Sequence, residues 1–218
     1  MQSIKTDFAK FLVDSQVIQF GEFKLKSGRI SPYFFNFGVL SSAKLLNCVA
    51  YYYARFLNNL QIDVDVIFGP AYKGIPLSVA SASAWQREFD RDVAFAFNRK
   101  EEKQYGDGGV IVGATLAKKQ VVIIDDVMTS GMTTDDSVSL VRKQGGKIQA
   151  YLVALDRQEV TLAEATSALA SAAERHQLPF YAISNIQHVL EYLSRTDKYK
   201  QHVDKISNYL VQYGAKHI

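Results

Sequence analysis

The chain contains a single cysteine, Cys48, among its 218 residues. One cysteine cannot form an intrachain disulfide, and such scarcity favours a reducing compartment. The first residues, MQSIKTDFAKF, lack the continuous apolar core of a signal peptide, and no apolar run approaches the length that spans a membrane. We therefore expect a cytoplasmic protein with no membrane partner.

The chain also contains few histidines and carries little net charge. All four histidines lie in the last fifth of the chain, away from every motif described below, so a zinc cluster or a serine-histidine-aspartate triad is poorly supported. The net charge of +3 fits plain solubility as well as it fits phosphorylated substrates. Its small size and scattered distribution do not indicate a nucleic-acid partner.

No repeat, linker or low-complexity tract interrupts the sequence. An apolar content of 48% and a charged content of 22% are ordinary for a soluble globular protein, and 218 residues can bury a substantial core. We therefore expect one domain over residues 1–218, with room for a small subdomain.

The most informative stretch is residues 121–136, VVIIDDVMTSGMTTDD. Its first four residues are β-branched, which is typical of a strand buried on both faces of a parallel sheet. Two carboxylates, Asp125 and Asp126, follow where that strand is expected to stop. Small and hydroxyl-bearing residues then precede a helix that we expect to begin near Thr134.

This loop suits a phosphate, because a helix N-terminus offers unpaired N–H donors and a partial positive charge. The acidic pair would repel phosphate and is better suited to neighbouring sugar hydroxyls. The implied ligand is a ribose 5-phosphate. An acidic turn that caps a helix in some other α/β protein is the plainer alternative.

A second strand, loop and helix occur earlier in the chain. Residues 64–68 are predicted to form a strand, and GPAYKG at 69–74 leads into a helix that runs toward Trp85. Lys73 and the backbone around it provide the cation and the N–H donors that a diphosphate needs. A lysine on an exposed turn is the alternative interpretation.

A charged tract, NRKEEKQYGDGG at residues 98–109, lies between strands predicted at 93–97 and 110–113. A run of charges is usually a solvated face, but a long connection inside a compact domain is often a functional lid. We therefore expect a long mobile loop here.

Two further features have both a structural and a functional interpretation. The aromatic run SPYFFNF at residues 31–37 is, taken alone, more typical of a core than of a binding site. Arg157 follows a strand predicted at 148–155, at the edge where open α/β sheets bind ligands. An arginine at such a place suits a carboxylate, and a surface ion pair is the alternative.

Residues 125–133, DDVMTSGMT, resemble the signature with which type I phosphoribosyltransferases bind phosphoribosyl pyrophosphate (PRPP), and GPAYKG resembles the diphosphate loop of that family. The resemblance implies an α/β fold whose central, mostly parallel sheet is flanked by helices. It also implies a small N-terminal hood over approximately residues 1–40, a PRPP-binding core over approximately residues 60–160, and a flexible catalytic loop.

Three other segments resemble orotate phosphoribosyltransferases in particular. LKSGRISPYFFN at 25–36 is similar to their hood, RKEEK at 99–103 to their flexible loop, and ALDRQE at 154–159 to the segment whose arginine meets orotate. The likeness implies a homodimer in which each loop closes over the neighbouring active site. Tyr105 departs from the usual histidine; a tyrosine cannot be a cation or a near-neutral proton shuttle, so its role stays open.

The resemblance assigns roles residue by residue. The catalytic residues are expected to be Lys103, Asp125 and Asp126. Orotate contacts are expected at Lys26, Phe34, Phe35, Thr129 and Arg157. PRPP contacts are expected at Lys26, Tyr72, Lys73, Arg99, Lys100, Lys103, Asp125, Asp126, Val127, Met128, Thr129, Ser130, Gly131, Met132 and Thr133.

The implied reaction converts orotate and PRPP into orotidine 5′-monophosphate and diphosphate, in de novo pyrimidine synthesis. Mg²⁺ is the expected cofactor, held mainly by substrate oxygens with no firm protein ligand. Two alternatives stay open: a phosphoribosyltransferase for a purine or uracil, and a PRPP-binding regulator without catalysis. A regulator would be expected to carry a nucleic-acid-binding surface, and neither an appended DNA-binding domain nor a basic stripe is apparent in the sequence.

Overall fold

The computed structural model describes residues 2–25, 27–103, 109–128, 132–161 and 165–215, and the side chains of all of these except residues 2, 102, 103 and 132. Within these residues, six strands form the main sheet in the order β5-β4-β3-β6-β7-β8. They are β3 (Val66–Gly69), β4 (Ala94–Lys103), β5 (Gly109–Gly113), β6 (Gln120–Val127), β7 (Lys147–Asp156) and β8 (Phe180–Asn185). Only β5 runs antiparallel to its neighbour, so the expected mostly parallel sheet is confirmed.

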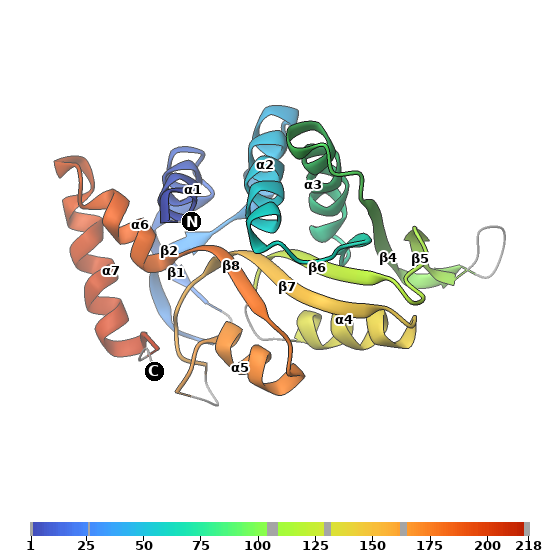
Figure 1. The fold of residues 1–218 in the computed structure, drawn as a ribbon. Coiled ribbons are helices and arrows are strands. Elements are labelled where there is room, and N and C mark those ends of the chain that lie inside the picture. Colours follow the sequence, from blue (N-terminus) through green and yellow to red (C-terminus); the bar gives the residue numbers. More distant parts are fainter. Residues whose placement is uncertain (1, 26, 104–108, 129–131, 162–164, 216–218) are drawn as a thin grey trace.

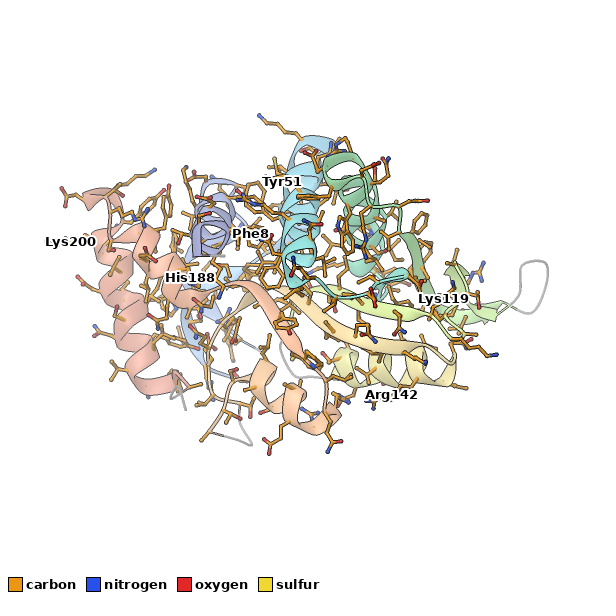
Figure 2. All side chains as sticks on the ribbon, viewed as in Figure 1. Phe8, Tyr51, Lys119, Arg142, His188 and Lys200 are labelled. Atoms are coloured by element: carbon orange, nitrogen blue, oxygen red, sulfur yellow. The ribbon has the colours of Figure 1, made fainter. Side chains whose placement is uncertain are left out.

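Helices cover both faces of this sheet, as Figure 1 shows. α1 (Gln2–Asp14), α2 (Ala43–Leu60) and α3 (Gly74–Phe89) lie on one face, and α4 (Met132–Lys143) and α5 (Ala168–His176) lie on the other. Each face has its own apolar cluster, because alternate residues of the central strands point to opposite sides. Phe8 belongs to the first cluster and lies between α1 and α2, against Tyr52 (Figure 2).

A smaller unit stands beside the sheet at the β8 end. The strands β1 (Ile18–Lys24) and β2 (Ile30–Phe35) form an antiparallel hairpin, followed by the short 3₁₀ helix η1 (Phe37–Val39). The chain returns to this unit at its other end, through α6 (Ile186–Leu193), η2 (Asp197–Tyr199) and α7 (Lys200–Tyr213). α7 packs against β2, so residues far apart in the sequence form this unit together (Figure 1).

The first informative stretch folds largely as the sequence predicts. Residues Val121–Ile124 are fully buried in β6, and the helix α4 begins at Met132, two residues before the expected start. The strand itself is longer than expected: it continues through Asp125 and Asp126 to Val127, because β6 keeps pairing with β7 as far as Leu155. The acidic pair therefore belongs to the last residues of a strand.

The charged tract differs more from its prediction. β4 extends from Ala94 to Lys103 and pairs with β5 in an antiparallel hairpin, so residues 99–103 form a strand where we expected a long loop. The reason is pairing between segments that a local pattern cannot reveal: Asn98 lies opposite Ile111, and Lys103 lies opposite Gly109. Residues 104–108, including Tyr105, lie outside the described residues.

Strand order fixes where a ligand can bind. β3 comes first in the parallel part of the sheet; the next strand, β4, adds on one side of β3, and β6 adds on the other. The chain connections that leave β3 and β6 therefore run in opposite directions. In open α/β sheets, ligands bind outside the carboxyl ends of the strands at such a switch point. Both predicted phosphate loops leave the sheet at this point. Among the described helices, none is both long and apolar enough to cross a membrane.

Candidate active site

Asp125 and Asp126 occupy the carboxyl end of β6 and are both almost completely buried. The hydroxyl of Tyr53, from α2, donates to the carbonyl oxygen of Asp125 at 2.6 Å, and the Tyr151 hydroxyl reaches the Asp125 carboxylate at 3.4 Å. The Asp126 N–H donates to Asp125 Oδ1 at 2.9 Å. These contacts fix the strand end and orient one of the two acids.

The two acids differ in their surroundings. Burial, and then the neighbouring Asp126 carboxylate, raise the pKa of Asp125 from 3.8 to about 7. Asp126 instead forms an ion pair with Lys73, whose Nζ lies 2.7 Å from Oδ2. A lysine thus balances the charge of Asp126, and the raised pKa of Asp125 favours its protonated form below about pH 7.

Lys73 belongs to the loop that follows β3, and two glycines shape this loop. A Cβ atom on Gly69 would lie 1.9 Å from the carbonyl oxygen of Gly74, and one on Gly74 would lie 2.7 Å from the carbonyl carbon of Gly69. The two ends of the loop therefore approach more closely than any other residue allows. The Ala71–Tyr72 peptide bond within it is cis. The tight turn brings Lys73 to the start of α3 and directly opposite Asp126.

Strand β4 supports the same loop from the other side. The Asn98 side-chain oxygen accepts from the N–H of Ala71 at 2.9 Å, and the Lys100 ammonium lies 4.7 Å from the centre of the Tyr72 ring. Arg99 donates to the carbonyl oxygen of Gly109 at 3.0 Å, across the hairpin. The structure thus brings together four of the predicted PRPP contacts, Tyr72, Lys73, Lys100 and Asp126. Asn98 was not predicted, because nothing in the sequence separates it from the charged residues that follow.

The second phosphate loop is described only at its two ends. Val127 ends β6, Met128 is buried, and α4 begins at Met132, with Thr133 exposed in its first turn. Thr129, Ser130 and Gly131 lie outside the described residues, as does Lys26 in the hairpin. The described ends nevertheless place the amino end of a 12-residue helix just beyond the acidic pair. That end of a helix carries the donors that a phosphate requires.

Arg157 follows β7 and is held in a buried network. Its Nε and Nη2 lie 3.0 and 2.6 Å from one Glu159 oxygen, Nη2 donates to the Ser31 hydroxyl at 3.2 Å, and the guanidinium lies 4.3 Å from the centre of the Tyr33 ring. The side chains of Arg157 and Glu159 are 13% and 10% exposed, so this pair is not a surface ion pair. Burial alone would lower the pKa of Arg157, but Tyr33 and Glu159 raise it above its ordinary value.

The paired phenylalanines of β2 point to opposite faces of the hairpin. Phe34 is 40% exposed and stacks on Phe23, whereas Phe35 is 6% exposed and packs on Phe37 in the core. Alternation along a strand dictates this separation. Only Phe34 therefore presents its ring outward, and a contact between Phe35 and a ligand would have to come from its backbone.

Comparison with known proteins places this site in a family. The phosphoribosyl transferase domain family matches residues 41–171. An orotate phosphoribosyltransferase of Nitrosococcus oceani is 38% identical over 218 residues, covering 100% of this chain and 99% of that protein. The chain belongs to the orotate phosphoribosyltransferase family.

Further relatives agree in sequence and in fold. The orotate phosphoribosyltransferase of Pseudomonas aeruginosa is 42% identical over 214 residues, covering 98% of this chain and 100% of that protein. A crystal structure of the Francisella tularensis orotate phosphoribosyltransferase matches with a TM-score of 0.84 at 37% identity, covering 95% of this chain and 99% of that chain. The resemblance, the fold class and the enzyme class expected from the sequence are confirmed, whereas the individual site residues stay predictions.

The unusual pKa of Asp125 gives a first testable prediction. The folded protein holds this proton more tightly than the unfolded chain, so the free energy of unfolding should fall as the pH rises from about 4 to about 7, and then level off. Asp125→Asn removes the ionisation and should raise the free energy of unfolding at pH 8, by on the order of 2–4 kcal/mol.

Chemical denaturation of the ligand-free protein between pH 4 and pH 8 measures this effect. Asp136→Asn is the matched control, because Asp136 is exposed in α4 and should leave the pH dependence unchanged. An Asp125→Asn variant with the same pH dependence as the unmodified protein would contradict the assignment.

Proposed function

We propose that this chain transfers ribose 5-phosphate from PRPP to orotate, giving orotidine 5′-monophosphate and diphosphate in pyrimidine biosynthesis. The observation that carries the proposal is the meeting of Lys73 and the acidic pair at the carboxyl ends of β3 and β6, beside the amino ends of α3 and α4. Full-length relatives in the orotate phosphoribosyltransferase family support the choice of orotate as the base.

The acidic pair is assigned to the ribose. In this proposal, Asp125 and Asp126 accept from the neighbouring ribose hydroxyls, and residues 127–133 bind the 5′-phosphate at the start of α4. The bond from the anomeric carbon to the diphosphate oxygen breaks as a base nitrogen bonds to that carbon, so positive charge develops on the ribose ring. Two carboxylates next to the ring stabilise that charge electrostatically.

The leaving diphosphate is assigned to the cationic residues of the β3 loop and the β4–β5 hairpin. Lys73, Arg99, Lys100 and Lys103 supply the positive charge, and Tyr72 supplies a hydrogen bond. Lys73 Nζ lies 2.7 Å from Asp126 Oδ2. In this proposal, Lys73 therefore exchanges Asp126 for a substrate oxygen when PRPP binds. This exchange frees Asp126 for the sugar at the moment when PRPP arrives.

Mg²⁺ is the cofactor of this proposal, and when bound it would supply positive charge that neutralises the leaving diphosphate. The donors available at the site fit it, since carboxylate oxygens are the hard ligands that Mg²⁺ prefers. Within the described residues, no cluster of three or more histidine, cysteine, aspartate or glutamate side chains could hold a metal unaided. The ion would therefore be held mainly by substrate oxygens, with the carboxylates of Asp125 and Asp126 nearby and neither of them a firm ligand.

The base is assigned to the region between Arg157 and the β1–β2 hairpin. Arg157 would bind the orotate carboxylate, with Phe34, the backbone of Phe35, Lys26 and Thr129 around the ring. Among the described residues, the guanidinium bonds of Arg157 use Nε and Nη2, which leaves the N–H groups of Nη1 to donate to a ligand. We further propose a cytoplasmic homodimer in which the β4–β5 hairpin reaches the partner's site.

A direct assay tests the proposed reaction. With PRPP and Mg²⁺ present, orotate absorbance should fall and diphosphate should appear in equal amounts, while uracil and hypoxanthine should give little turnover because they lack the carboxylate assigned to Arg157. Omitting PRPP is the control. Preferred turnover of uracil or hypoxanthine, or PRPP binding without any turnover, would contradict the proposal.

Lys103, at the end of β4 in the β4–β5 hairpin, gives a separate prediction. Lys103→Ala should lower kcat on the order of 100-fold, because a charged donor to the departing diphosphate is typically worth about 3 kcal/mol in the transition state. Steady-state kinetics and thermal unfolding measure the two effects, and the unfolding temperature should not change. Lys119→Ala is the matched control, because Lys119 is exposed at the opposite end of β6 (Figure 2). Near-normal turnover by Lys103→Ala would reject the role assigned to Lys103 at the leaving diphosphate.

Sharing of the hairpin between subunits can be tested by mixing. A Lys103→Ala chain and an Asp125→Asn, Asp126→Asn chain should each be nearly inactive alone. In a mixed dimer, one site receives an intact hairpin and an intact acidic pair, so part of the activity should return. Mixed dimers verified by differential tagging that stay inactive would show that each hairpin serves its own subunit.

A further inference from the structure

The Glu159 carboxylate is the centre of a network that joins three distant parts of the chain. It accepts from Arg157, which follows β7, from the Tyr33 hydroxyl of β2 at 2.6 Å, and from the Tyr209 hydroxyl of α7 at 3.1 Å. These contacts join the β1–β2 hairpin, the segment after β7 and the helix α7. The proposed reaction uses Arg157 alone from this network and leaves the other three side chains without a role.

Both phenols are donors at neutral pH. Burial, followed by Glu159, raises the pKa of Tyr209 to about 12. The pKa of Tyr33 is raised well above its ordinary value, mainly because its side chain is completely buried. The Glu159 carboxylate is therefore bound by two neutral hydroxyls and a guanidinium, which suits an ionised acid in a buried position.

The backbone reinforces this junction. The N–H of Val160 donates to the carbonyl oxygen of Tyr213 at 2.8 Å, and the N–H of Ala215 donates to that of Gln158 at 2.7 Å. Arg29, in the β1–β2 hairpin, donates to the carbonyl oxygen of Val160 at 2.8 Å. The segment after Arg157 is thus tied to the end of α7 and to the hairpin, so the position of Glu159 depends on both.

Glu159 in turn determines how Arg157 points. Its contacts occupy the Nε and Nη2 edge of the guanidinium, and Tyr33 lies against the guanidinium face. A long arginine side chain has many rotamers, and fixing one of them before the ligand arrives reduces the entropy lost on binding. The remaining Nη1 edge is then held ready for the carboxylate of the base.

We propose that Glu159 is a positioning residue for Arg157, and that Tyr209 of α7 holds Glu159 in place, so that the C-terminal helix sets the enzyme's affinity for the base. The inference rests on the proposed function, because it assumes that Arg157 binds the base carboxylate. In a competing explanation, the Glu159 carboxylate binds the Arg157 guanidinium in place of orotate, and orotate has to displace it. Positioning predicts weaker orotate binding when Glu159 is removed, and competition predicts tighter binding.

Steady-state kinetics of three variants test the proposal. Tyr209→Phe removes one oxygen atom and should raise KM for orotate about threefold to tenfold, while kcat and KM for PRPP stay within about twofold. Glu159→Ala should raise KM for orotate further, by at least about tenfold, because it removes the acceptor for Arg157 and both phenols. Glu159→Gln keeps an oxygen acceptor and should give an intermediate KM.

Tyr213→Phe is the matched control. Tyr213 lies beside Tyr209 in α7, with ring centres 4.9 Å apart, and contacts Arg29 through its ring, which phenylalanine retains. This variant should bind orotate normally. Thermal unfolding of each variant checks folding, and Tyr209→Phe keeps the proposal testable if Glu159→Ala does not fold.

A double variant tests whether Tyr209 acts through Arg157. In an Arg157→Lys background, Tyr209→Phe should add no further rise in KM for orotate, because the group that it positions is gone. An additive effect, an unchanged KM in Tyr209→Phe, or a lower KM in Glu159→Ala would each overturn the inference. Failure of the unmodified protein to consume orotate would instead reject the proposed function, and the two outcomes are therefore distinguishable.

Discussion

Two neighbouring carboxylates held out of water at the end of one strand are the constraint around which this protein is built. Adjacent buried acids repel each other and lose hydration, and both effects raise the pKa of Asp125. The fold accommodates the pair through specific contacts rather than by exposing it. Tyr53 from α2 fixes the backbone at Asp125, and Lys73 from the β3 loop neutralises Asp126. The acidic pair therefore depends on a hydroxyl from α2 and a cation from the β3 loop.

Much of this arrangement could be predicted from local sequence. The β-branched run before Asp125 indicates a buried strand, and the small residues after it indicate a loop and a helix start, because these signals depend only on neighbours in the chain. The GPAYKG loop is predictable for the same reason. Its two glycines approach each other within one turn, so the requirement is local.

The failures concern contacts between segments far apart in the sequence. Residues 99–103 have the charge of a loop, yet they form a strand because β5 returns to pair with them. Phe34 and Phe35 are equivalent by resemblance, and only the pairing and packing of β2 show which of the two rings is buried. Glu159 is unremarkable in sequence, since its partners Tyr33 and Tyr209 lie 126 residues before it and 50 residues after it.

Because α7 packs against the β1–β2 hairpin, the order of synthesis limits when the parts of the site can be completed. During translation, β3, β6 and the loops that follow them leave the ribosome well before Tyr209, Tyr213 and Ala215, which complete the junction around Glu159. The segments that carry Lys73 and the acidic pair are therefore synthesised before the contacts around Glu159 can be completed. Under the proposed assignment of Arg157 to the base, the junction that orients this arginine is the last part of the site to be completed.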